Sequence, residues 1–326
     1  MSQEQEPVFV PLDLAERQPR GGIRALRDRL DFVLFLSPAL LVLAIFLVYP
    51  AYYTIRLSFY DSNPFLFTFT NWVGLDNYKN LLTNDPAFLD LHTFPPSGAV
   101  INNLRWVVFY IGLSLIFGLG LAVLAVRVRY ERAVKSVIFV PMAIAATAVG
   151  IIWLFVYSPD INTGVLNATI HAFDHGFHPI AWTGRDSTVN YALIFAYVWA
   201  STGFVMVVMA AAIKGISTEV LEAARVDGAG EWALFRRIML PMLSLPLSIV
   251  TVWLFINVIK LFDIIYVMTG GGPGTSSRVI AFTMFQETFA NGRPGYGAAV
   301  AVVMLLVLLP VIIFNVRRFR SERVIA

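Results

Sequence analysis

Cysteine is absent from this 326-residue chain, which excludes a disulfide framework, a cysteine-ligated metal site and a thiol nucleophile. Charged residues are scarce, at 14% of the chain, and they gather in a few short stretches. Soluble domains carry more charge than this. The small net charge of +3 is therefore expected to report membrane topology and not nucleic-acid binding.

Catalytic and nucleotide-binding signatures are also missing. The chain has no glycine-rich loop ending in lysine that would cradle a phosphate, so we expect it to bind no ATP and no other cofactor itself, and not to be an enzyme. His171 and His175 have the spacing of two metal ligands on one helix face, near Asp174 and His178. A polar loop outside the membrane explains them equally well, and we predict no metal site.

Long apolar runs are what the chain does contain. Hydrophobic residues make up 58% of it, and its mean hydropathy is +0.71. Runs of eighteen or more apolar residues are typical of membrane helices. The sequence thus predicts an all-α membrane protein with six transmembrane helices, at about residues 31–53, 101–126, 137–157, 189–213, 243–268 and 295–316.

The basic residues predict the orientation of these spans. Seventeen Lys and Arg residues fall in the head, the loop at 127–135, the loop at 214–242 and the tail, whereas six fall in the alternate segments. Cytoplasmic segments carry the excess of positive charge, so we expect both termini in the cytoplasm. Residues 1–30, which include Arg17 and Arg20, are interpreted as a cytoplasmic tail and a surface helix, and residues 31–326 as the membrane domain.

The polar stretch between the fourth and fifth apolar runs predicts a helix, a break and a second helix. Ser217 is placed to cap the first helix, and Asp227-Gly228 ends it, because glycine tolerates the left-handed conformation of such a break. Glu231 opens the second helix. The stretch reads Glu222-Ala223-Ala224, then Gly228, then Ile238-Met239-Leu240-Pro241.

These three elements resemble the EAA motif in permease subunits of ATP-binding-cassette (ABC) importers. The resemblance implies the type I ABC importer permease fold, a location in the cell inner membrane, and a cytoplasmic coupling loop at 214–242 that docks on an ATPase subunit. Glu222, Ala223, Ala224, Asp227 and Gly228 would be its coupling residues. The implied partners are two ATPase subunits, which hold ATP and Mg, a homologous second permease, an extracytoplasmic sugar-binding protein and membrane lipid; no nucleic acid is expected.

Polar residues within the fifth apolar run are candidates for a substrate site, since polar groups are costly in hydrocarbon and usually face a cavity or a neighbour. They are Asn257, Lys260 and Asp263. Lys260 and Asp263 are three residues apart and can pair, so a neutralised anchor near the outer surface and a role in substrate binding both stay open. The fourth run adds Tyr197, Ser201 and Phe204.

A second resemblance, to permeases of the maltose and α-glucoside or trehalose type, covers nearly the whole chain. It is carried by the EAA motif, by the segment from Phe262 to Pro273 and by the ending Val316-Arg317-Arg318-Phe319. It implies that the chain forms the translocation pathway for such a sugar. The family's pocket positions fall on Tyr197, Ala200, Ser201, Phe204, Asn257, Val258 and Leu261, where Val258 and Leu261 replace asparagines of the maltose pocket.

Two other interpretations remain. A permease of the same class for an amino acid or a peptide would keep the motif, although the aromatic segment after the first span and the glycine-rich turn at 270–273 favour sugar. A secondary transporter driven by an ion gradient would show an inverted repeat and intramembrane acidic relays, whereas here only Asp263 is present, near a surface.

Overall fold

The computed structural model describes residues 22–63 and 67–323, and it divides the chain into two units at Tyr53. In the first unit one continuous helix begins at Gly22, as α1 (Gly22–Leu43), the π-helical turn η1 (Ala44–Val48) and the start of α2 (Tyr49–Leu57). Most of its apolar side chains between Val33 and Tyr52 are exposed. No break separates a surface helix from the span at residue 31; the predicted tail, with Arg17 and Arg20, lies outside the described residues.

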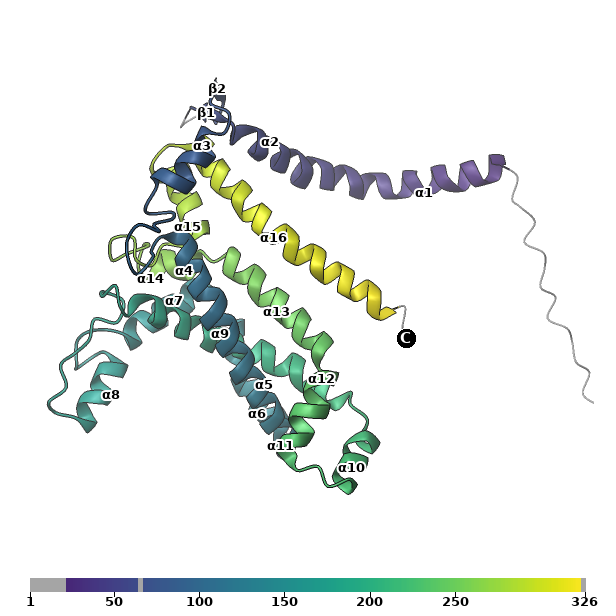
Figure 1. The fold of residues 1–326 in the computed structure, drawn as a ribbon, viewed down its shortest axis with the longest axis vertical. Coiled ribbons are helices and arrows are strands. Elements are labelled where there is room, and N and C mark those ends of the chain that lie inside the picture. Colours follow the sequence, from purple (N-terminus) through teal and green to yellow (C-terminus); the bar gives the residue numbers. More distant parts are fainter. Residues whose placement is uncertain (1–21, 64–66, 324–326) are drawn as a thin grey trace, which may run out of the picture. The chain divides into compact units, whose positions relative to one another are not determined.

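The second unit is helical apart from one small antiparallel sheet (Figure 1). Strands β1 (Tyr60–Ser62) and β2 (Phe69–Trp72) are followed by α3 (Asp76–Lys79) and the π-helical turn η2 (Asn80–Asn84). The predicted second span is continuous through α4 (Ala99–Trp106), η3 (Val107–Ile111) and α5 (Gly112–Arg127).

Two of the six predicted spans are broken and not single helices. The third consists of α6 (Glu131–Phe139), the short turn η4 (Val140–Ala143) and α7 (Ala146–Val156), with a bend of 99°. The fifth region bends by 69° where α13 (Ser244–Ile259) begins, and the helix stops at Ile259 before α14 (Asp263–Met268). The described chain thus has four continuous helices able to cross a membrane, or six spans if each bent pair counts as one.

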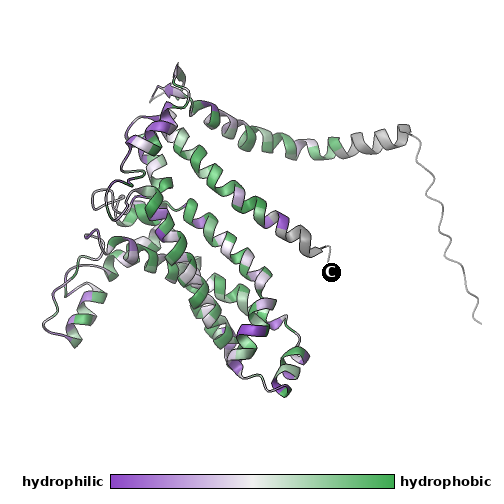
Figure 2. Ribbon diagram, viewed as in Figure 1, coloured by the Kyte–Doolittle hydropathy of each residue, from purple (hydrophilic) through white to green (hydrophobic). Residues whose placement is uncertain are grey.

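The remaining elements follow the predicted order. They are α8 (Val165–Phe173) in the loop before the fourth span, α9 (Val189–Lys214) as that span, and α15 (Ile280–Phe285), η6 (Gln286–Ala290) and α16 (Pro294–Arg323) at the end of the chain. Hydrophobic residues run along α9, α13 and α16, whereas hydrophilic residues gather at the strands, α3 and the loops (Figure 2). This pattern is typical of helices that face lipid and each other.

The core of the second unit is built around α9, whose buried residues pack against α5 and α7. Small residues allow the close approach, as they do at helix interfaces in membranes. A Cβ atom added at Gly203 would lie 2.4 Å from the carbonyl oxygen of Ile138, and one added at Gly118 would lie 2.4 Å from Cγ1 of Val205. The packing of α9 against α6 therefore depends on Gly203, and its packing against α5 depends on Gly118.

We expect Gly118→Ala to lower the melting temperature of the purified protein by several degrees. The added methyl group overlaps Val205, whose branched side chain has little freedom to move in a packed helix. Gly120→Ala is the matched control, since nothing lies within 4 Å of the Cβ that it adds in the same helix. If both variants melt alike, the close approach of α5 to α9 does not hold the core together.

Candidate functional site

A small polar cavity of about 160 Å³ lies beside the break between α13 and α14. Five of the seven residues predicted for the substrate site line it, although they come from two separate regions of the sequence. The lining consists of Tyr197, Asn257, Lys260, Leu261 and Asp263, together with Ala146, Phe262 and Ile264. The structure thus brings most of the predicted residues together.

Asn257 presents one side-chain atom for binding. Its Nδ2 donates a hydrogen bond to the backbone oxygen of Trp253 at 2.8 Å, one turn earlier in α13. The described contacts give its Oδ1 no partner, so this oxygen can accept a hydrogen bond from a hydroxyl or ammonium group in the cavity.

Lys260 and Asp263 do not form the ion pair that their spacing allows. The helix ends between them, so the i, i+3 geometry on which that expectation rested is lost. Both side chains are exposed, and no ion pair among the described residues joins them. Two opposite charges therefore stand at the edge of the cavity without neutralising each other by contact.

The other predicted residues pack behind the cavity. Ser201 is buried, and its hydroxyl accepts a hydrogen bond from the Tyr110 hydroxyl at 2.9 Å. The ring of Phe204 lies against the ring of Trp253, with centroids 4.3 Å apart. Val258 is fully buried, and Ala200 packs against the core. These four do not line the cavity.

The motif loop forms the predicted helix, break and helix. Helix α10 (Thr218–Val226) ends at Asp227, and Gly228 has φ +86°, the left-handed conformation predicted for it. Ser217 precedes α10 but its side chain makes no capping hydrogen bond, so that detail was wrong. The second helix begins at Glu231 and runs through α11 (Glu231–Leu234), η5 (Phe235–Met239) and α12 (Leu240–Met242).

The surface of α10 and α11 that faces away from the core is exposed and could contact a partner subunit. Glu222 and Ala223 are exposed while Ala224 is buried. Val220, Val226 and Trp232 expose apolar side chains, Val226 to 87%. Since Val220, Ala223 and Val226 are three residues apart on one helix, they form an exposed apolar stripe beside Glu222.

Two groups of ion pairs hold the loop to neighbouring helices. Glu231 accepts from Arg127, at the end of α5, with a distance of 2.6 Å, and from Nε of Arg225 in α10 at 3.2 Å. Glu131 in α6 pairs with Lys214 at 2.6 Å and with Lys135. The basic residues at 127–135 had been interpreted as topology signals only, because sequence spacing gives no sign of partners about 80 to 100 residues away.

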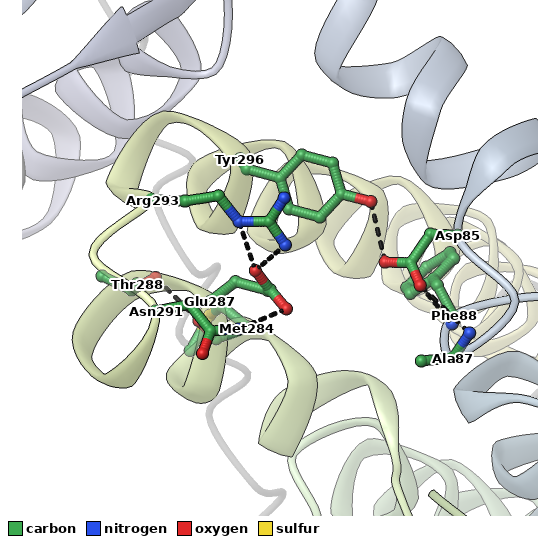
Figure 3. A network of polar contacts seen from close by, with 9 residues as sticks. All are labelled: Asp85, Ala87, Phe88, Met284, Glu287, Thr288, Asn291, Arg293 and Tyr296. Carbon is green, nitrogen blue, oxygen red and sulfur yellow. Dashed lines mark hydrogen bonds and ion pairs between the residues drawn. The ribbon is translucent and has the colours of Figure 1, made fainter.

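A second polar network lies at the other end of the unit, near α3 (Figures 1 and 3). Glu287 is buried and accepts hydrogen bonds from the Arg293 guanidinium and from Nδ2 of Asn291. The hydroxyl of Tyr296 donates to Oδ2 of Asp85 at 2.8 Å. The network borders a cavity of about 440 Å³ and joins Asp85, the residue after η2, to the start of α16.

We expect Arg293→Met to destabilise the protein by about 3 kcal/mol, because it leaves the buried Glu287 carboxylate without its cation. Adding Glu287→Gln should restore most of the loss, since it removes the unpaired charge. Thermal unfolding of the purified variants measures both effects. Arg185→Met, which removes an exposed cation, is the control; an equal loss there, or no rescue by Glu287→Gln, would contradict the account.

The histidines outside the spans are not arranged as their spacing predicted. Helix α8 ends at Phe173, so His171 and His175 do not share a helix face, although their rings lie 5.7 Å apart. Among the described residues no group of three or more histidines, cysteines or carboxylates could hold a metal ion.

Comparisons with known proteins agree with this architecture. Residues 114–322 match the family described as "Binding-protein-dependent transport system inner membrane component". The chain is 41% identical over 293 residues to the osmoprotective compounds uptake permease protein GgtC of Synechocystis sp., covering 89% of this chain and 99% of that protein. It is 36% identical to the alpha-glucoside transport system permease protein AglF of Rhizobium meliloti, covering 89% and 82%.

A solved structure shows the same fold. A chain of a bacterial ABC transporter involved in the import of the acidic polysaccharide alginate matches with a TM-score of 0.70 at 23% identity, covering 91% of this chain and 99% of that one. The family match confirms the resemblance to ABC importer permeases and the location in the inner membrane. This chain belongs to the family of inner membrane components of binding-protein-dependent transport systems.

Proposed function

We propose that this chain forms the translocation pathway of an ATP-driven importer for an α-glucoside such as trehalose or maltose, or for a related glycoside. The cavity at the break of the fifth span carries this proposal. It offers the free Oδ1 of Asn257, the charged groups of Lys260 and Asp263 and the Tyr197 side chain to one small ligand. Planar and charged polar groups of this kind suit the many hydroxyls of a sugar.

The names of the relatives support the substrate class. AglF is named for alpha-glucoside transport and GgtC for uptake of osmoprotective compounds. The departures at Val258 and Leu261 leave fewer hydrogen-bonding groups than the maltose-type pocket has, which favours a smaller set of sugar contacts. The cavity of about 160 Å³ has room for part of a disaccharide.

The coupling loop would connect the membrane spans to the ATPase subunits, whose ATP hydrolysis drives transport. Two ATPase subunits, which bind ATP and Mg, would hold the exposed stripe of α10 with Glu222 at its edge, and Gly228 permits the turn into α11. Closure of the ATPase pair on ATP would move this loop and the spans attached to it. A homologous second permease completes the pathway, and a binding protein delivers the sugar from outside; this is alternating access with the ATPase pair as the two-state element.

A charged or zwitterionic solute is the second candidate, and one observation favours it. Lys260 and Asp263 stand at the cavity edge without pairing, so an ammonium and a carboxylate group of one ligand could each meet an opposite charge. The screen of solutes therefore includes amino acids.

The test is ATP hydrolysis by the reconstituted complex with its binding protein, screened against trehalose, maltose, other α-glucosides and a set of amino acids. Stimulation by an α-glucoside supports the proposal. Stimulation by amino acids alone would replace it with the second candidate, and a response to neither would remove both.

A further inference from the structure

The break in the fifth span leaves backbone groups that a continuous helix would satisfy. Lys260 N–H still bonds back to Ile256, but Leu261 N–H turns to the oxygen of Val258 at 3.3 Å, and α14 starts afresh at Asp263. Unpaired backbone groups within a membrane protein cost several kcal/mol each where water does not reach them. The Val258 oxygen, whose bond from the Leu261 N–H is long at 3.3 Å, can accept a second hydrogen bond from elsewhere in the chain.

Asn103 in α4 supplies that bond. Its Nδ2 donates to the backbone oxygen of Val258 at 3.0 Å, and its Oδ1 accepts from the backbone N–H of Ile280 at 2.8 Å. Ile280 is the first residue of α15, whose first N–H groups have no partner within the helix. The side-chain amide of Asn103 carries both a donor and an acceptor. It therefore bonds a backbone oxygen at the end of α13 and a backbone N–H at the beginning of α15.

Burial makes these two bonds decisive for the local geometry. Asn103 is 4% exposed, Val258 is 0% exposed and Ile280 is 4% exposed, so water cannot replace either bond. Val258 directly follows Asn257, which lines the cavity, and precedes Lys260 and Leu261 in its lining. The position of Val258 thus sets the position of the cavity wall.

The neighbouring Asn102 bonds to a different segment, the loop before α15. Its Nδ2 donates to the backbone oxygens of Ser276 and Arg278, both at 2.8 Å, and its Oδ1 accepts from Arg105. Successive residues on a helix point about 100° apart, so Asn102 holds the loop before α15 while Asn103 holds the break. Asn102 is also buried, at 1% exposed.

We propose that Asn103 is a positioning residue for substrate: it fixes the broken end of α13, and with it the Asn257 oxygen and the cavity lining, without touching the transported molecule. This inference rests on the proposed function of the cavity. It adds a residue from the start of the second span, 155 positions from Val258, to the determinants of substrate affinity.

The experiment compares Asn103→Leu with Asn102→Leu in the reconstituted complex with its binding protein, using the solute that stimulates the wild type. Each variant removes two side-chain bonds to backbone groups from the same helix, and Asn102→Leu also removes the bond from Arg105, so both should lower the melting temperature. Asn103→Leu alone should raise the solute concentration for half-maximal ATP hydrolysis by about tenfold, with the maximal rate kept within about twofold, because the cavity and not the ATPase is disturbed.

The outcomes distinguish the positioning role of Asn103 from the assignment of the cavity as the substrate site. An unchanged half-maximal concentration in Asn103→Leu, or an equal rise in Asn102→Leu, overturns the positioning role. If Asn257→Ala raises the concentration in the same experiment, the cavity assignment survives that result; if it does not, the proposed site itself fails. Should Asn103→Leu not assemble, Asn103→Asp carries the test: it keeps the acceptor for Ile280, but when ionised it places a carboxylate oxygen and no donor against the Val258 oxygen, so it should show at least the same rise.

Discussion

The Gly228→Val variant is expected to retain less than about a tenth of substrate-stimulated ATP hydrolysis. Gly228 has φ +86° at the turn between α10 and α11, and a β-branched residue in that region costs roughly 1–3 kcal/mol of strain. The chain would relieve this strain by turning α10, and with it Glu222 and the exposed stripe, away from its docking orientation. The readout is stimulated ATP hydrolysis and uptake by the reconstituted complex.

Gly230→Val is the matched control for this prediction. Gly230 lies two residues later, has φ −68° and ψ 161° as the residue before α11, and has nothing within 4 Å of an added Cβ. It should behave like the wild type, since valine accepts that conformation readily. Equal activity of the two variants would show that the left-handed turn does not transmit the coupling.

The second large effect is expected from Asn257→Ala. Removal of the Oδ1 of Asn257, a residue that lines the cavity, should raise the substrate concentration for half-maximal uptake by about tenfold, because we expect this oxygen to accept one hydrogen bond from the bound solute. The maximal rate of uptake should change little, because the lost bond contributes equally to the bound ground state and to the transition state. Initial rates of uptake at a series of solute concentrations measure both quantities.

Thr251→Val is the control in the same helix. Thr251 Oγ1 donates to the backbone oxygen of Leu247 at 2.7 Å, as Asn257 Nδ2 donates to Trp253, but Thr251 does not line the cavity. It tests the loss of a side-chain-to-backbone bond without the loss of a ligand group. A similar rise in both variants would mean that α13 is sensitive to any substitution and that Asn257 has no special part.

The fold was predictable where the signal is local. The apolar runs located the span that α9 forms and the helices at 99–127 and 294–315 to within a few residues, because hydropathy depends only on neighbouring residues. The left-handed turn at Gly228 was equally local. The break after Ile259 was missed, since no proline or glycine marks it and the apolar character continues through Leu261 and Phe262. It is held by Asn103 from another helix.

In the candidate site, too, local signals were predictable and contacts between distant residues were not. Polar residues in the fifth apolar run identified Asn257, Lys260 and Asp263, which the structure brings to one cavity with Tyr197. The pair that the spacing of Lys260 and Asp263 allows does not form, because the helix ends between them. Ser201 turned out to be buried against Tyr110, a contact between residues 91 positions apart that no spacing rule can reveal.

The absence of cysteine allows the central claim, that solute passes through the cavity at the broken span, to be measured directly. Phe262→Cys places a thiol in the cavity lining, and Phe173→Cys places one on the exposed end of α8. In a complex whose other chains carry no reactive cysteine, the transported solute should slow thiol labelling of Phe262→Cys severalfold and leave labelling of Phe173→Cys unchanged. If a solute that stimulates ATP hydrolysis leaves the labelling rate of Phe262→Cys unaltered, the solute does not occupy this cavity.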